Sequence, residues 1–142
     1  MSEVIDHFKG EFDWLSNFHN CPVHFEGLTF GNTEAAFQAA KTLDMEEREK
    51  FVGLAAGQAK RKGRRVELRS DWEAVKIEVM REVLRCKFSQ NPELKAKLIA
   101  TGDSELIEGN NWNDRFWGVC RGKGQNHLGR LLMELRAELK GE

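Results

Sequence analysis

The sequence has few cysteines and no long hydrophobic run. Only three cysteines occur among 142 residues, and Cys21, Cys86 and Cys120 lie far apart. Their odd number and wide spacing predict neither a disulfide framework nor a CxxC redox pair. Residues 1–9 lack the apolar core of a signal peptide, and no apolar run reaches the roughly 18 residues of a membrane span. We therefore expect a chain that remains in the reducing cytoplasm and binds no membrane.

An excess of charge of either sign is also absent. The chain has 22 Lys and Arg against 23 Asp and Glu, a formal net charge of -1. Dedicated nucleic-acid and membrane binders are usually basic overall, so this balance argues against both classes, although a local basic cluster is compatible with it. A chain of this length can bury a sufficient core without disulfides or metals. No linker or repeat divides it, so we predict a single domain over residues 1–142.

Hydrophobic periodicity predicts a mostly helical chain with a small antiparallel sheet in its N-terminal third. Residues 23–30 indicate a hairpin with Glu26 and Gly27 at its tip. We expect Asp71 to cap the clearest helix, and residues 104–108 to form a strand. The helices are expected at residues 32–43, 45–54, 55–62, 71–88, 92–100 and 125–140. Because the strands are not spaced between helices as in βαβ units, the predicted fold class is α+β.

The helix expected at 32–43 carries its long polar residues on one stripe of an alanine-rich surface. Glu34, Gln38 and Lys41 follow at i, i+4 and i+7, hence on one side of a helix. Glu34 and Lys41 would lie about 10 Å apart along the axis, which suits a small substrate between them. Two interpretations remain open: a solvated helix face, and an acid and an amine that act on a substrate.

Residues 110–118 form a second candidate segment, which combines Trp112 and Trp117 with Asp114 and several amides. Tryptophan stacks well on heterocycles, and Asp114 is a candidate acid, base or electrostatic stabiliser. In the alternative interpretation, Phe116 and Trp117 are core residues of a short strand and Asp114 is a turn residue. We favour that alternative for Phe116, and a functional role for Asp114 and Trp117.

Two segments could bind phosphate. Residues 121–126 offer two glycines, two cations and backbone N–H groups at a helix start, although the spacing fits neither a Walker A loop nor a GxGxxG fingerprint. An ordinary flexible cap is the alternative there. The basic run at 60–65, with Arg69 beyond it, is the other segment, because guanidinium groups bind phosphate bidentately. The four histidines show no metal-ligand pattern, and we expect no metal and no cofactor.

Four ordered segments together resemble the NADAR family, also called YbiA-like. They are LSNF at 15–18, NTEAAFQAAK at 32–41, DWEAVK at 71–76 continuing through MR and CKF to residue 88, and NDRFWG at 113–118 with GQNHLGRLLM at 124–133. These segments cover nearly the whole chain. The resemblance implies a largely helical α+β fold and N-glycosidase activity on ADP-ribose-linked or riboflavin-pathway compounds.

The resemblance also implies which residues line the pocket. The family usually has a histidine after the motif glutamate, whereas this chain has Ala35, so any role of that histidine is absent here. The family's pocket residues map to Asn17, Phe18, Glu34, Lys41, Trp72, Asp114 and Trp117. With the residues argued above, the predicted catalytic set is Glu34, Lys41 and Asp114, and the predicted substrate-binding set is Asn17, Phe18, Gln38, Arg61, Arg64, Arg69, Trp72, Asn113, Trp117, Gly118 and Asn126.

These residues together predict a hydrolase that cleaves the C1–N bond of a phosphorylated ribosylamine or an ADP-ribosyl compound. The substrate would be a nucleotide-like small molecule, either free or as an ADP-ribosylated nucleobase in nucleic acid. Glu34 or Asp114 would act as general acid/base, or Lys41 would attack a ring-opened C1 as a Schiff-base nucleophile. The alternatives are a non-catalytic module that binds ADP-ribose or a nucleotide, and an interaction protein without a ligand.

Overall fold

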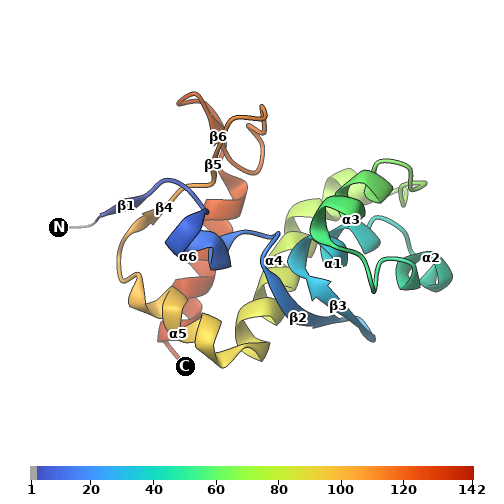
Figure 1. The fold of residues 1–142 in the computed structure, drawn as a ribbon, viewed down its shortest axis with the longest axis horizontal. Coiled ribbons are helices and arrows are strands. Elements are labelled where there is room, and N and C mark those ends of the chain that lie inside the picture. Colours follow the sequence, from blue (N-terminus) through green and yellow to red (C-terminus); the bar gives the residue numbers. More distant parts are fainter. Residues whose placement is uncertain (1–2) are drawn as a thin grey trace. The chain divides into compact units, whose positions relative to one another are not determined.

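The computed structural model describes residues 3–142, which fall into two compact units (Figure 1). We call residues 17–91 the hairpin unit, and residues 3–16 together with 92–142 the terminal unit. Residues 1 and 2 lie outside the described residues. They are the first two of residues 1–9, for which we expect no signal peptide. Within residues 3–142, no helix combines the length and the apolar character needed to cross a membrane.

The predicted hairpin is confirmed. Strands β2 (Asn20–Phe25) and β3 (Leu28–Asn32) pair antiparallel. Glu26 and Gly27 form the turn between them, with φ angles of 49° and 89°. A two-residue turn with positive φ at both positions matches the right-handed twist of the strands, and glycine adopts this conformation without a steric penalty.

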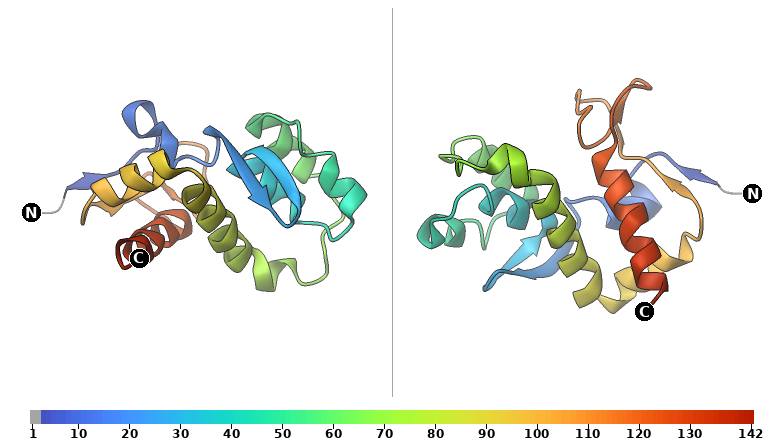
Figure 2. Two further views of the ribbon diagram at one scale, coloured as in Figure 1. Left: turned by 90° about the horizontal axis from the view of Figure 1, so that it is seen from below. Right: turned by 180° about the vertical axis from the view of Figure 1, so that it is seen from behind.

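Helix α1 lies at the centre of the hairpin unit. It packs against β2 and β3 and against the other three helices of the unit, mainly α3 and α4 (Figures 1 and 2). It ends earlier than the sequence predicts, because the N–H groups of Lys41 and Thr42 donate to carbonyls only three residues back and tighten the last turn. The four helices of this unit are α1 (Thr33–Ala39), α2 (Met45–Glu49), α3 (Ala56–Gly63) and α4 (Trp72–Gln90).

The apolar stripe of α4 is buried as the periodicity predicts. Its buried hydrophobic residues are Trp72, Met80, Val83, Leu84 and Phe88. The capping role predicted for Asp71 is wrong, because its side chain makes no bond to the helix start. The Asp71 carboxylate instead accepts two hydrogen bonds from the Arg69 guanidinium, at 2.6 and 3.0 Å.

The terminal unit contains two short parallel strand pairs, β1 with β4 and β5 with β6. Helix α6 packs against β4 and α5 (Figure 2). The strand expected at 104–108 is only two residues long, too short for an alternating pattern. The elements are β1 (Val4–Ile5), the 3-10 helix η1 (Gly10–Leu15), α5 (Pro92–Ala100), β4 (Glu105–Leu106), β5 (Gly109–Asn110), β6 (Val119–Cys120) and α6 (His127–Lys140).

The predicted core face of the last helix is confirmed. Leu128, Leu131, Leu132, Leu135 and Leu139 of α6 are all buried. The predicted α+β class is confirmed as well: the chain is mostly helical, and its antiparallel sheet is the hairpin of the N-terminal third.

We predict that Asn32→Ala destabilises the hairpin unit by about 1–3 kcal/mol, because two bonds of a buried cap are lost. Asn32 is 1% exposed; its Oδ1 accepts from the Ala35 N–H at 2.8 Å and its Nδ2 donates to the Leu54 carbonyl at 3.1 Å. Urea unfolding measures the loss. Asp71→Ala is the control, since it removes only a solvent-exposed ion pair and should cost less. Equal losses in the two variants would contradict the capping role of Asn32.

Candidate active site

The structure holds Glu34 rigidly in the first turn of α1. Its backbone N–H donates to the Asn17 carbonyl at 3.0 Å, and its Oε1 accepts from Gln38 Nε2 at 3.1 Å. Glu34 is 7% exposed and Gln38 is 5% exposed. The interpretation of this stripe as a solvated helix face is therefore wrong for both residues. A buried carboxylate and amide on a helix this rich in alanine form a polar site inside the unit.

Lys41 belongs to the same site, although it lies beyond the last residue of α1. It is half-buried, and its Nζ lies 3.5 Å from the Gly63 carbonyl oxygen. Burial lowers the pKa of the Lys41 amine, the Glu34 carboxylate raises it, and the Arg64 guanidinium lowers it. The three charges therefore interact. The helical spacing of about 10 Å does not apply, because the chain leaves the helix before Lys41.

Gly63, the last residue of α3, forms a wall of this site. A Cβ added at Gly63 would lie 1.8 Å from Gln38 Oε1 and 2.6 Å from Gln38 Cδ, so only glycine allows this approach of α3 to α1. Gln38 Oε1 is buried and receives no hydrogen bond from any described residue. The sequence identified Gly63 only as a helix end. We refer to Glu34, Gln38, Lys41, Gly63 and Arg64 as the Glu34–Lys41 cluster.

The loop before β2 adds an aromatic group beside the start of α1. Asn17 is buried; its Nδ2 lies 3.6 Å from Met80 Sδ, and its Oδ1 has no hydrogen-bond partner among the described residues. Phe18 is 46% exposed, and Lys60 Nζ lies 5.9 Å from the centre of its ring. An exposed ring with a cation over it can stack on a heterocycle. Lys60 belongs to the basic run at residues 60–65 but is not one of the predicted site residues.

Trp72 is a core residue of the hairpin unit. It is 5% exposed, and its ring packs against Phe37 with centroids 5.2 Å apart. These contacts leave little of the Trp72 ring open to solvent. The predicted contact of Trp72 with a substrate stays a prediction.

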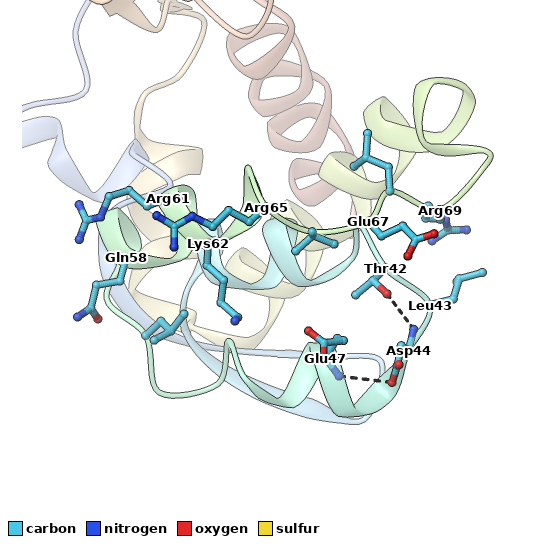
Figure 3. A pocket seen from close by; sticks show the side chains of 13 residues that line it. Thr42, Leu43, Asp44, Glu47, Gln58, Arg61, Lys62, Arg65, Glu67 and Arg69 are labelled. Carbon is cyan, nitrogen blue, oxygen red and sulfur yellow. Dashed lines mark hydrogen bonds between the residues drawn. The ribbon is translucent and has the colours of Figure 1, made fainter.

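Of the three arginines predicted to bind phosphate, only Arg64 interacts with the Glu34–Lys41 cluster. Arg61 and Arg69 instead border a cavity of about 880 Å³ between α2, α3 and residues 65–69 (Figure 3). The Arg69 guanidinium is bonded to Asp71, which raises the pKa of Arg69. Arg69 therefore already has a carboxylate partner, and its contact with a phosphate stays a prediction.

In the terminal unit, Asp114 closes a turn. Its Oδ1 accepts from the N–H groups of Phe116 and Trp117, at 3.2 and 2.9 Å. This is the turn role that the alternative interpretation assigns to Asp114. Its Oδ2 receives no hydrogen bond from residues 3–142, so one oxygen is available for proton transfer. Asn110, which the sequence analysis did not single out, shapes this loop by bonding both backbone groups of Asp114.

The aromatic side chains of this loop pack on one another. Phe116 and Trp117 are half-buried and meet edge to face, with centroids 4.8 Å apart. Phe116 also lies 4.5 Å from the His127 ring, so its predicted packing role is partly met. Asn113 is exposed, with a φ of 64°, and the substrate contacts of Asn113 and Trp117 stay predictions.

At the helix end of the loop predicted to bind phosphate, residues 121–126, the backbone N–H groups are already used. The N–H groups of residues 125–128 donate to the carbonyls of residues 115, 118, 116 and 117. Asn126 is 8% exposed, and its side chain bonds Leu106 and Glu108, which is a structural role. Gly118 is also required structurally, because a Cβ there would lie 1.8 Å from Glu108 Oε2. The N–H groups at the helix start are therefore not available to a phosphate, and an anion contact by the rest of the loop stays a prediction.

The predicted residues thus form two sets. The hairpin unit brings together Asn17, Phe18, Glu34, Gln38, Lys41 and Arg64, whereas the terminal unit carries Asn113, Asp114, Trp117, Gly118 and Asn126. That both sets border one substrate stays a prediction.

The NADAR domain family matches residues 6–140. The chain belongs to this family.

Its relatives include N-glycosidase YbiA of Escherichia coli, which is 45% identical over 142 residues, 96% of this chain and 88% of that protein. The NMR structure of the E. coli protein YbiA superposes with a TM-score of 0.87, at 41% identity, and covers 99% of this chain and 87% of that one. A riboflavin biosynthesis protein of Vibrio vulnificus is 40% identical over 89% of this chain, which covers 35% of that longer protein. In Zea mays, the chloroplastic riboflavin biosynthesis protein PYRR is 46% identical over 92% of this chain, which covers 20% of it.

We predict that Gly63→Ala damages the Glu34–Lys41 cluster, because its Cβ cannot coexist with the present position of Gln38. Overpacking of this kind costs about 1–3 kcal/mol, and thermal or urea unfolding measures it. Gly57→Ala on the same helix is the matched control: its Cβ would lie 3.7 Å from Arg61 Nη1, an ordinary contact. That control should be neutral or stabilising by up to about 1 kcal/mol. If Gly63→Ala were equally harmless, the close approach of the two helices would not be required.

Proposed function

We propose that this protein hydrolyses the C1–N bond of a phosphorylated ribosylamine or an ADP-ribosyl compound. It is an enzyme that acts on N-glycosyl bonds, as is indicated by relatives that are named N-glycosidase and match 96% of the chain. The observation that carries the proposal is the buried Glu34 carboxylate beside the Lys41 amine, because a non-catalytic nucleotide-binding module needs neither group in that position.

Cleavage of a C1–N bond requires a proton for the leaving nitrogen and stabilisation of positive charge at C1. Glu34 can supply either, because its position is fixed by the Asn17 carbonyl and by Gln38. Asp114 is the second candidate carboxylate, with its Oδ2 available. Removal of the group that transfers the proton should cost at least about a hundredfold in rate.

Lys41 offers a second route to the same products. A lowered pKa increases the fraction of neutral amine, the form that attacks a ring-opened C1 and forms a Schiff base. Burial and Arg64 favour that form, whereas Glu34 opposes it. Water would then hydrolyse the imine and release the free sugar, and the departing base would take up a proton from the carboxylic acid.

The substrate class follows from the groups around the cluster. Phe18 presents a ring suited to stacking on a heterocycle, and Arg64 presents an unburied guanidinium suited to a phosphate. The names of the riboflavin biosynthesis relatives favour phosphorylated ribosylaminopyrimidines among the candidates, and ADP-ribosylated guanine is the second substrate to test.

We predict that the purified protein releases free base from ribosylaminopyrimidine phosphates or from ADP-ribosylated guanine, as measured by chromatography. Glu34→Gln should bind the same substrate and turn it over at least about a hundredfold more slowly. Binding without turnover by the unmodified chain would support the non-catalytic module instead. If the unmodified chain shows neither binding nor turnover of these substrates, the result would support an interaction protein without a ligand.

We also predict that borohydride traps substrate on Lys41, and that the pH dependence of trapping moves with the charges around the amine. Arg64 lowers the pKa of Lys41, so Arg64→Ala should raise that pKa and shift trapping to higher pH. Glu34 raises it, so Glu34→Gln should shift trapping to lower pH. Mass spectrometry of the reduced adduct measures both shifts, with Lys41→Arg as the control that keeps the charge. An adduct retained in Lys41→Arg, or no adduct in the unmodified chain, would refute the imine route.

A further inference from the structure

The cavity of the hairpin unit that borders Arg61 and Arg69 lies outside the Glu34–Lys41 cluster. Its walls come from residues 42–44, α2, α3 and residues 65–69 (Figure 3). None of the five residues of the cluster lines this cavity. Thr42 lines it, whereas the Nζ of its neighbour Lys41 lies 3.5 Å from the Gly63 carbonyl oxygen. At about 880 Å³ the cavity is large enough for a mononucleotide.

One wall of this cavity carries three cations that have no carboxylate partner among residues 3–142. These are Arg61, Lys62 and Arg65, which follow one another on the last turn of α3 and the turn after it. Figure 3 shows the Lys62 side chain pointing into the space between α3 and α2, whereas the Arg61 and Arg65 side chains extend sideways along α3. The Lys62 ammonium lies 5.6 Å from the centre of the Phe51 ring.

The acidic groups around the cavity do not neutralise these cations. Glu47 is paired with Lys50 at 2.7 Å, and the Asp44 Oδ1 accepts the N–H groups that start α2. Glu67 is the one further carboxylate in the lining. Arg69, the fourth cation, is paired with Asp71 outside the lining. The wall formed by α3 is thus left with an uncompensated positive charge.

Most of the remaining lining is apolar, and part of it is open to solvent. Leu43 is 64% exposed and Leu68 is 50% exposed, while Leu54 and Val66 are half-buried. Leucine side chains that open into a cavity next to unpaired guanidinium groups suit a ligand with one flat apolar part and one multiply charged anionic part.

We propose that this cavity binds a nucleoside phosphate, with the phosphates on Arg61, Lys62 and Arg65 and the base against the leucines. The site is independent of glycosidic cleavage, because it contains neither Glu34 nor Lys41. The ligand is either a free nucleotide or a nucleotide within a single-stranded nucleic acid, since both present the same base and phosphate.

The test is calorimetric titration of the full chain with ADP, and separately with a single-stranded hexanucleotide that has no ADP-ribose. Saturable binding should weaken at least about tenfold in Lys62→Ala/Arg65→Ala, because two charge-assisted contacts are removed. Lys9→Ala/Lys97→Ala is the matched control, since it removes two exposed lysines from the terminal unit and should leave the affinity unchanged. Glu34→Gln should also bind normally, which separates this result from a failure of the glycosidase proposal.

Three results would overturn the proposal: no saturable binding of either probe, equal weakening in the control pair, or weakening by Arg64→Ala but not by Lys62→Ala/Arg65→Ala. The last result would place the ligand in the Glu34–Lys41 cluster. Binding of ADP alone identifies a free nucleotide as the ligand, and displacement of ADP by the hexanucleotide identifies a strand. Amide NMR shifts confined to residues 42–44 and 61–69 provide a second readout, and unchanged spectra elsewhere show that the double variant is folded.

Discussion

The candidate site depends on how closely α1 packs against its neighbours. Ala35, Ala36, Ala39 and Ala40 are at most 1% exposed, and their small side chains let the hairpin, α3 and α4 surround the helix. That enclosure buries the side chains of Glu34 and Gln38 side by side, and Gln38 Nε2 donates a hydrogen bond to Glu34 Oε1. A buried carboxylate is tolerated only where hydrogen bonds or charges replace its hydration, and here an amide and the nearby Lys41 do so.

The elements that sequence periodicity could reveal are those that bury a regular face. The stripes of α4 and α6 and the Glu26–Gly27 turn were predictable for this reason. Helix ends were not, because the tight turn after α1 depends on local backbone hydrogen bonds that several sequences could form. The two-residue strand β1 was also beyond prediction, and the bounds of β4 within the predicted segment 104–108 were too, since both strands exist only through pairing with a segment a hundred residues away.

The chemistry of the site could be predicted better than its geometry. Glu34, Gln38 and Lys41 were chosen by type and spacing, and the structure does gather them, but by way of a turn rather than a continuous helix. The pairing of Arg69 with Asp71 and the use of every N–H at residues 125–128 could not be inferred, because both depend on where side chains and carbonyls lie in the folded chain.

Gly63 gives the polar site one wall that consists of main chain rather than of a side chain. Evolution usually reshapes a pocket by exchanging side chains, and that option is closed at this wall as long as Gln38 stays in place. Divergence in what the site accepts must therefore arise at its open edge, where Phe18 and Arg64 are exposed and replaceable without repacking. Among homologous sequences, variation should concentrate at that edge, while the glycine and the glutamine change together or not at all.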